Sequence, residues 1–317
     1  MNPLLIQIDM FGVWHITIAI VLSLAAASLI WKQPLPRVAR ALWVYVLVYA
    51  IYILEFPARH FGDFTIAYQV TAGQVAVEAL LIPLGAMALY KFWHKILPIV
   101  VIGELICVWI KHPGLMVAPS FNLALCAVSL PFLPLWMVVS VAVTALTHHG
   151  STAILILIAQ SIGMSRRYPR LLLLIPFCGL AAWIHSNGPM IDGLERLEHW
   201  NKYMSFWWGS GWKTILLGFG PGSFIHTSMW LDKYKAPLFF QMHNDFLQSI
   251  WELGIVGFSL IIGVVATAIK RTWDRPKELA AVLGCVAFAI PYHPLRFCPS
   301  ALVMAVIFWK ALKKEGL

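Results

Sequence analysis

The residues best suited to chemistry lie in the stretch QMHNDFLQSIWELGIVGF, at positions 241–258. His243 directly precedes a predicted apolar helix, and a neutral imidazole there can accept a proton from a hydroxyl nucleophile. Asn244 or Asp245 can cap the start of that helix and so fix the approach of the ring. A capped helix end with an interfacial histidine that has no catalytic role is the alternative interpretation.

Three polar side chains share one face of the same predicted helix. Asp245, Gln248 and Glu252 follow one another at helical spacing. The rest of the segment reads as membrane-buried, where polar groups are costly to expose to lipid. We therefore expect these three groups to face a water-filled cavity or other parts of the protein.

Two further features suit an anion. Arg196, in GLERLEHW, offers a fork of donors that matches phosphate geometry, although a solvated charge on the polar face of a helix is the alternative. In ILLGFGPGSF, Gly220 and Gly222 belong to a tight turn whose backbone amides can approach an anion closely. The Lys-Ser/Thr pair of a nucleotide-binding P-loop is missing after these glycines, and a plain turn is the alternative.

The sequence predicts neither a metal site nor a cofactor. His148 and His149 are adjacent, but adjacent residues rarely chelate one ion together, and no carboxylate is near them in sequence. The five cysteines lie in apolar stretches without a Cys-x-x-Cys spacing, so we expect small core residues rather than zinc ligands or a disulfide framework.

The elements that must position these residues are predicted to be membrane helices. The chain of 317 residues is 60% hydrophobic and only 12% charged, with a mean hydropathy of +0.79. Long apolar runs recur from end to end, which predicts an all-α polytopic membrane protein with about eleven transmembrane helices. The candidate spans are about 11–31, 41–56, 66–90, 96–110, 119–133, 134–147, 151–164, 171–185, 246–269, 279–292 and 298–312.

The distribution of charge predicts an orientation and excludes a nucleic-acid partner. The net charge is +9, but Lys and Arg gather in short loops between apolar runs, as the positive-inside rule requires. Most of these cations fall on the cytoplasmic side when the N-terminus is outside, whereas most histidines, His243 included, fall on the outer side. We therefore expect any chemistry on the external face.

Three regions follow from this topology. Residues 1–185 are predicted to form N-terminal transmembrane helices, 186–245 a large external loop, and 246–317 the C-terminal transmembrane helices. The loop is rich in Trp and Gly, and contains one predicted amphipathic helix that suits a membrane–water interface. We expect the lipid bilayer itself to be a partner.

The motifs GLERLEHW, ILLGFGPGSF and HNDFLQSIWELGIVG together resemble the O-antigen ligase and O-antigen polymerase superfamily of bacterial inner-membrane proteins. The match covers about 192–260, and the remaining helices fit by topology alone. The resemblance implies a membrane-type, metal-independent glycosyltransferase. Such an enzyme takes glycan from undecaprenyl pyrophosphate and passes it to a hydroxyl of an acceptor glycolipid or glycan, on the periplasmic side of the inner membrane.

The resemblance also implies roles for individual residues. The matching positions are His243, as the general base, and Arg196, which would bind the pyrophosphate. Beyond the resemblance, we expect Asn244 and Asp245 to orient the base, and His149, Gly220 and Gly222, with either Arg59 or Arg296, to contribute to the pyrophosphate site. Thr147-His148-His149-Gly150 stands where family members often carry Ser-Arg-Gly, so histidine replaces an arginine there.

Other functions remain open at this point. Polymerases and protein-glycosylating relatives share the donor chemistry of the ligases. A transporter of lipid-linked glycan or of small solutes would use the polar groups to line a path, and would favour discontinuous helices and an internal repeat. An inactive relative serving as an assembly subunit is the third possibility, which the histidine-for-arginine change allows.

Overall fold

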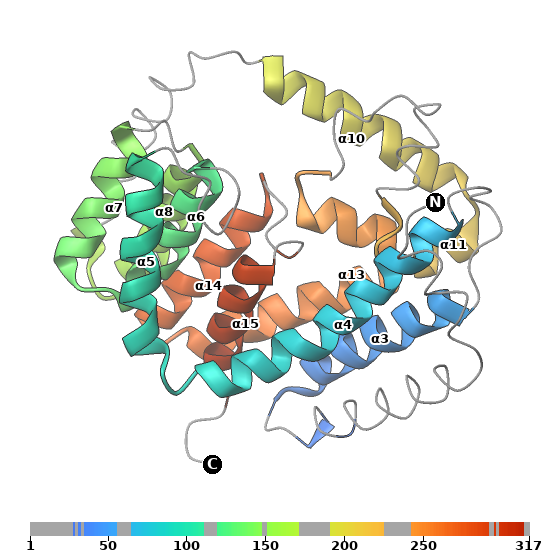
Figure 1. The fold of residues 1–317 in the computed structure, drawn as a ribbon, viewed down its shortest axis with the longest axis horizontal. Coiled ribbons are helices and arrows are strands. Elements are labelled where there is room, and N and C mark those ends of the chain that lie inside the picture. Colours follow the sequence, from blue (N-terminus) through green and yellow to red (C-terminus); the bar gives the residue numbers. More distant parts are fainter. Residues whose placement is uncertain are drawn as a thin grey trace.

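The computed structural model describes residues 28, 31–32, 35–55, 65–110, 119–147, 151–170, 191–224, 242–291, 295 and 298–313. Within these ranges the regular structure is entirely helical (Figure 1). The helices are α3 (Arg37–Glu55), α4 (Thr65–Leu89), α5 (Trp93–Trp109), α6 (Pro119–Ser129), the 3-10 helix η3 (Leu130–Phe132), α7 (Leu135–Thr147), α8 (Ser151–Ser165), α10 (Ile191–Gly209), α11 (Trp212–Leu217), α13 (Asp245–Thr272), α14 (Pro276–Ala289) and α15 (Cys298–Leu312).

The predicted apolar spans coincide closely with these helices. For example, the predicted span 151–164 corresponds to α8, and 298–312 to α15. In the proline-rich stretch 119–147, α6 and η3 are separated from α7 by a break before Leu135, so that stretch forms two helical pieces. The predicted span 171–185 and most of 11–31 lie outside the described residues.

By length and composition, fewer of the described helices could cross a membrane than the sequence predicted. Among the described helices, α13 alone is both long and apolar enough to cross a bilayer. The part of α4 from Val75 to Leu89, together with α5, is a second candidate if the two form one span, which is then bent by 111°. The remaining apolar helices, such as α7, α8 and α15, are shorter than the roughly 20 residues that a bilayer requires. The predicted fold of about eleven spans is therefore not confirmed.

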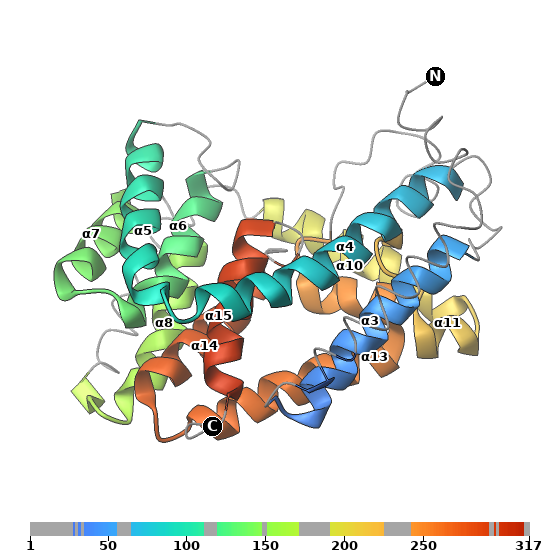
Figure 2. The same cartoon turned by 60° about the horizontal axis from the view of Figure 1, so that its bottom comes forward.

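The helices form two groups joined by α14 and α15. Helices α5 to α8 gather on one side of the molecule, whereas α3 and α4 lie side by side, α3 against α13 and α4 against α15 (Figures 1 and 2). Helix α14 joins the first group through α8, where Gly163 packs so closely that an added Cβ would lie 2.6 Å from Ala280 Cα. Helix α10 lies across the N-terminal part of α13.

Helix α13 is interrupted at Gly254, where φ is 64° and ψ is −171°. A continuous helix would use the carbonyls of residues 251–253 in its own hydrogen bonds. Here the amides of Phe219 and Gly220 donate to the carbonyls of Trp251 and Glu252, both at 2.9 Å. The Tyr45 hydroxyl donates to the Leu253 carbonyl at 3.0 Å. The glycine-rich turn is therefore fixed to the break in α13.

Only glycine fits on either side of this contact. An added Cβ on Gly254 would lie 2.3 Å from the Leu216 carbonyl oxygen, and one on Gly218 would lie 2.4 Å from the backbone of Glu252. Gly218 also has a positive φ of 78°. Two backbone segments that are distant in sequence thus touch directly, and this contact sets the position of α11 and the turn against α13.

Candidate functional site

The start of α13 is built by local hydrogen bonds. Asn244 is the N-cap of the helix, and its Oδ1 accepts the Leu247 amide at 2.9 Å. This satisfies one of the backbone donors that a helix start leaves open, and it confirms the predicted cap. The cap places His243 immediately outside the first turn.

His243 has an unusual backbone conformation. Its φ is 51°, and it is the one described non-glycine residue with a positive φ. Such a conformation costs roughly 1–3 kcal/mol and persists where the surroundings hold it. The preceding residue is held on both sides, because the Met242 carbonyl accepts the Trp200 indole N–H at 2.6 Å and the Met242 amide donates to Gln248 Oε1 at 3.3 Å.

Arg196 and His243 line one small pocket between α10 and the start of α13. The pocket encloses about 10 Å³, which suits about one water-sized group. The pocket is lined by side chains of α10, of the end of the glycine-rich turn and of the two residues before the cap of α13: Arg196, His199, Trp200, Tyr203, Phe224, Met242 and His243. The two residues singled out from sequence are therefore neighbours in the fold.

The electrostatics of this pocket favour a neutral imidazole. Burial of the ring lowers the pKa of His243, and the nearby positive charge of Arg196 lowers it further, to about 4. At neutral pH the ring is unprotonated and able to accept a proton.

Arg196 has unused hydrogen-bonding capacity. Its Nη1 donates to the Pro291 carbonyl at 3.3 Å, whereas its buried Nε has no hydrogen-bond partner among the described residues. A buried donor without a partner costs about 1–3 kcal/mol, and a single anionic oxygen reaching into this pocket would remove that cost.

An aromatic cluster fixes α10 over α13 beneath the pocket. Tyr203 packs edge-on against Phe224 and Trp251, with ring centroids 5.0 and 5.9 Å apart. Trp251 is fully buried and also contacts Phe219, at 4.7 Å between centroids. These contacts join α10, the glycine-rich turn and α13, and so fix the position of Arg196 on α10 relative to His243 before α13.

The polar face of α13 bonds to other parts of the protein. Gln248 Nε2 donates to Glu252 Oε1 at 2.9 Å, and Glu252 Oε2 accepts the Gly222 amide at 2.7 Å. Both side chains are buried. These polar groups were predicted to face either a water-filled cavity or other parts of the protein. The hydrogen bonds of Gln248 and Glu252 are with other parts of the protein.

The glycine-rich turn is not open to an anion at the predicted positions. The Gly222 amide is bonded to Glu252 Oε2, and the Gly220 amide to the Glu252 carbonyl. Because both donors are engaged inside the protein, the structure argues against the predicted role of Gly220 and Gly222 in binding pyrophosphate.

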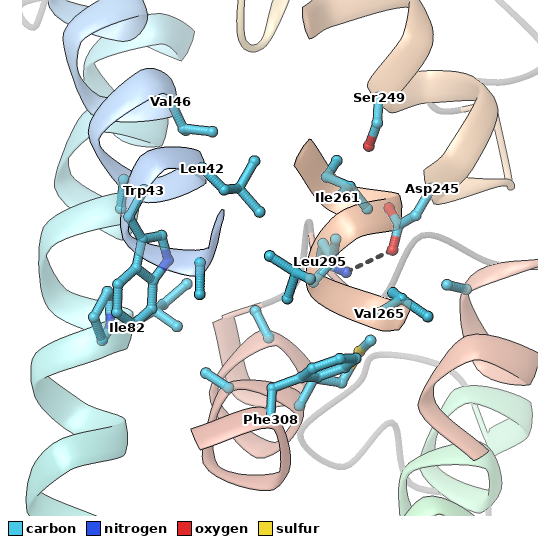
Figure 3. A pocket seen from close by; sticks show the side chains of 18 of the residues that line it. Leu42, Trp43, Val46, Ile82, Asp245, Ser249, Ile261, Val265, Leu295 and Phe308 are labelled. Carbon is cyan, nitrogen blue, oxygen red and sulfur yellow. Dashed lines mark hydrogen bonds between the residues drawn. The ribbon is translucent and has the colours of Figure 1, made fainter. Parts of the chain in front are cut away.

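Asp245 makes a contact outside the pocket of Arg196 and His243. Its Oδ2 accepts the Leu295 amide at 3.0 Å, which joins Leu295 to the start of α13 (Figure 3). Both residues line a cavity of about 290 Å³. Asp245 thus bonds to the segment before α15, and its expected orienting role toward His243 stays a prediction.

The cavity is almost entirely apolar. Leu42, Trp43 and Ile82, from α3 and α4, form one wall, and α13, α14 and α15 form most of the rest (Figure 3). Its polar lining among the described residues consists of side chains on α4 and α13: Glu78, Asp245, Ser249 and Glu252. Such a cavity suits an apolar chain with a polar group at the α13 end.

Three predicted site residues, Arg59, His149 and Arg296, lie outside the described residues. Conversely, sequence reasoning missed His199, Trp200 and Tyr203 as parts of the pocket. Their spacing from Arg196 along one helical face was the available signal. Within the described ranges, no three His, Cys, Asp or Glu side chains come together in a way that could hold a metal ion.

Comparisons of the chain with protein-family models, with curated proteins and with solved structures find no match.

Proposed function

We propose that the protein is a membrane-embedded glycosyltransferase of the O-antigen ligase type, which moves glycan from undecaprenyl pyrophosphate to an acceptor hydroxyl at the outer face of the bacterial inner membrane. The observation that carries this proposal is the shared pocket of Arg196 and His243, in which an unprotonated imidazole lies beside a guanidinium with an unpartnered buried N–H.

The proposed reaction is a single displacement. The acceptor oxygen attacks the anomeric carbon as His243 takes its proton, and the bond from that carbon to the pyrophosphate oxygen breaks. The bonding electrons remain on the leaving oxygen, whose negative charge Arg196 stabilises. The configuration at the anomeric carbon is therefore inverted, and the imidazolium later releases its proton to water.

A bound donor would also adjust the base. A pKa of about 4 keeps His243 unprotonated at neutral pH, but makes it a weak base. The negative charge of a pyrophosphate beside the ring offsets the effect of Arg196 and raises the pKa of His243 toward its ordinary value of 6.5. The base is thus strengthened when the donor is in place.

The membrane part of the proposal rests on exposed apolar side chains. Leu81 on α4, Ile99 on α5 and Trp136 on α7 are 61%, 72% and 60% exposed. Apolar surfaces spread over several helices are typical of contact with lipid. We infer that α13 and the shorter apolar helices together form a polytopic, multi-pass bundle.

The apolar cavity gives the lipid part of the donor a place. It lies between the helices and reaches Asp245, which is two residues from His243. A polyprenyl chain would fit against this apolar lining, while its phosphate-bearing end would lie outside the cavity, away from the carboxylates of Glu78, Asp245 and Glu252 and toward Arg196.

Two residues test the proposal. His243→Ala and Arg196→Ala should each lower glycan transfer at least about 100-fold in membranes supplied with lipid-linked glycan, because each removes a group that acts in the transition state. His94→Ala, which changes an exposed histidine on α5, is the matched control and should retain activity. Full transfer by the His243 variant would refute the general-base role.

A transporter is the second candidate, favoured by the break in α13 at Gly254. However, the carbonyls of residues 251–253 accept hydrogen bonds from Phe219, Gly220 and Tyr45, so they are engaged within the protein. This arrangement supports a fixed structural joint, and we therefore favour the enzyme. Uptake or flipping of lipid-linked glycan without transfer to an acceptor would favour the transporter.

A further inference from the structure

A buried chain of hydrogen bonds links the glycine-rich turn to the residue before His243. The Gly222 amide donates to Glu252 Oε2 at 2.7 Å, and Gln248 Nε2 donates to Glu252 Oε1 at 2.9 Å. At the other end, Gln248 Oε1 accepts the Met242 amide at 3.3 Å. Gln248 and Glu252 are 2% and 1% exposed, so water does not readily replace these bonds.

The order of donors and acceptors along this chain is restrictive. Both ends are backbone N–H groups, which only donate. Gln248 supplies one donor and one acceptor, so the chain is satisfied only when its other member accepts at both oxygens. The carboxylate of Glu252 does this. If residue 252 were a glutamine, two side-chain amides would stand between the two backbone N–H groups. Whichever way these amides are turned, one N–H in the chain then faces another N–H instead of an oxygen.

We propose that Glu252, acting through Gln248, is a positioning residue for His243. The carboxylate fixes the orientation of the Gln248 amide, whose oxygen accepts the Met242 N–H. The Met242 carbonyl accepts the indole N–H of Trp200 on α10. The positive φ of His243 directly after this peptide is the conformation that these contacts maintain. The inference rests on the proposed function, since it assigns these residues to the placement of the general base.

The exchange of the two side chains tests the proposal. Glu252→Gln creates the two-amide chain and should lower glycan transfer about tenfold or more. It should also increase hydrogen–deuterium exchange at Met242 and Gly222. The double variant Gln248→Glu with Glu252→Gln restores one carboxylate and one amide in the opposite order. It should recover both transfer and amide protection to near the wild-type level.

A neighbouring substitution separates this effect from general damage. Ser249 is a buried polar residue on the same turn of α13, but it lines the cavity rather than the hydrogen-bonded chain. Ser249→Ala should leave exchange at Met242 unchanged. If Glu252→Gln does not fold, the double variant alone decides: a folded and active double variant supports the chain, and an inactive one overturns it.

Failure of the positioning role of Glu252 can be distinguished from failure of the proposed glycosyltransferase function. If His243→Ala retains transfer, the general base is wrong, yet exchange at Met242 and Gly222 still reports whether the chain holds this loop. Wild-type transfer and wild-type exchange in Glu252→Gln would overturn the positioning role. So would a loss of transfer with unchanged exchange at Met242.

Discussion

At the scale of single residues, the site depends on how the imidazole of His243 is kept unprotonated. Burial is the larger cause of its lowered pKa, and the charge of Arg196 is the smaller one. Removing the arginine therefore relieves only part of the shift. The two causes can be separated in part, because His199, Trp200, Tyr203, Phe224 and Met242 line the pocket of His243 together with Arg196 and remain when Arg196 is replaced.

The pH dependence of kcat/KM should show this shift. Transfer stays constant as the pH falls from 7 to about 5, and it declines as His243 gains a proton near pH 4. In Arg196→Met the remaining activity should decline at a higher pH, between about 4 and 6.5, because the loss of the positive charge makes protonation easier. Lys202→Met, which removes an exposed cation from the same helix, should leave the profile unchanged. A wild-type decline near pH 6.5 would contradict the burial of the ring.

At the scale of elements, the break in α13 and the glycine-rich turn depend on each other. Gly218 and Gly254 both have φ and ψ values that are almost restricted to glycine. A Cβ added to either residue would also clash with the backbone nitrogen of the other. The turn can therefore approach α13 only where both residues lack a Cβ. This contact also places Gly222 within reach of Glu252.

A series of glycine-to-alanine substitutions separates conformation from contact. Gly254→Ala adds a strained φ and a backbone clash, so it should lower the thermal stability most. Gly211→Ala adds the strain alone, because no atom lies within 4 Å of the new Cβ, and should cost about 1–3 kcal/mol. Gly209→Ala adds neither and should change the unfolding free energy by at most about 1 kcal/mol. Equal melting temperatures for the Gly254 and Gly209 variants would show that the turn does not pack on α13.

Sequence patterns predicted the helices better than their joints. Hydrophobic runs locate α8 and α15 to within a residue or two, because the apolar faces that helices bury or expose to lipid are encoded locally. The break at Gly254 depends on the approach of Leu216 and Gly218, which no local pattern encodes. The same reason explains Gly222: its position in a turn was predictable, but the carboxylate that occupies its amide comes from a distant helix.

At the scale of the whole molecule, the proposed function requires the site and the basic end of α13 to lie on opposite sides of a membrane. His243 directly precedes the cap of α13, whereas Lys270 and Arg271 are in its last turn. At about 1.5 Å per residue, a helix of 28 residues is long enough to cross a hydrocarbon core of about 30 Å, even with its break. The basic end is expected in the cytoplasm.

Cysteine labelling in intact cells tests this arrangement. In a cysteine-free background, Ser205→Cys lies exposed on α10 near the site, and Asp274→Cys lies exposed just beyond α13. A charged, membrane-impermeant maleimide should label position 205 in intact cells and position 274 only after the membrane is opened. Because both positions are exposed, a lack of labelling at position 274 in intact cells reflects the membrane rather than burial within the protein. Equal labelling of both positions in intact cells would remove the bilayer from between them, and with it the external site that the transfer reaction requires.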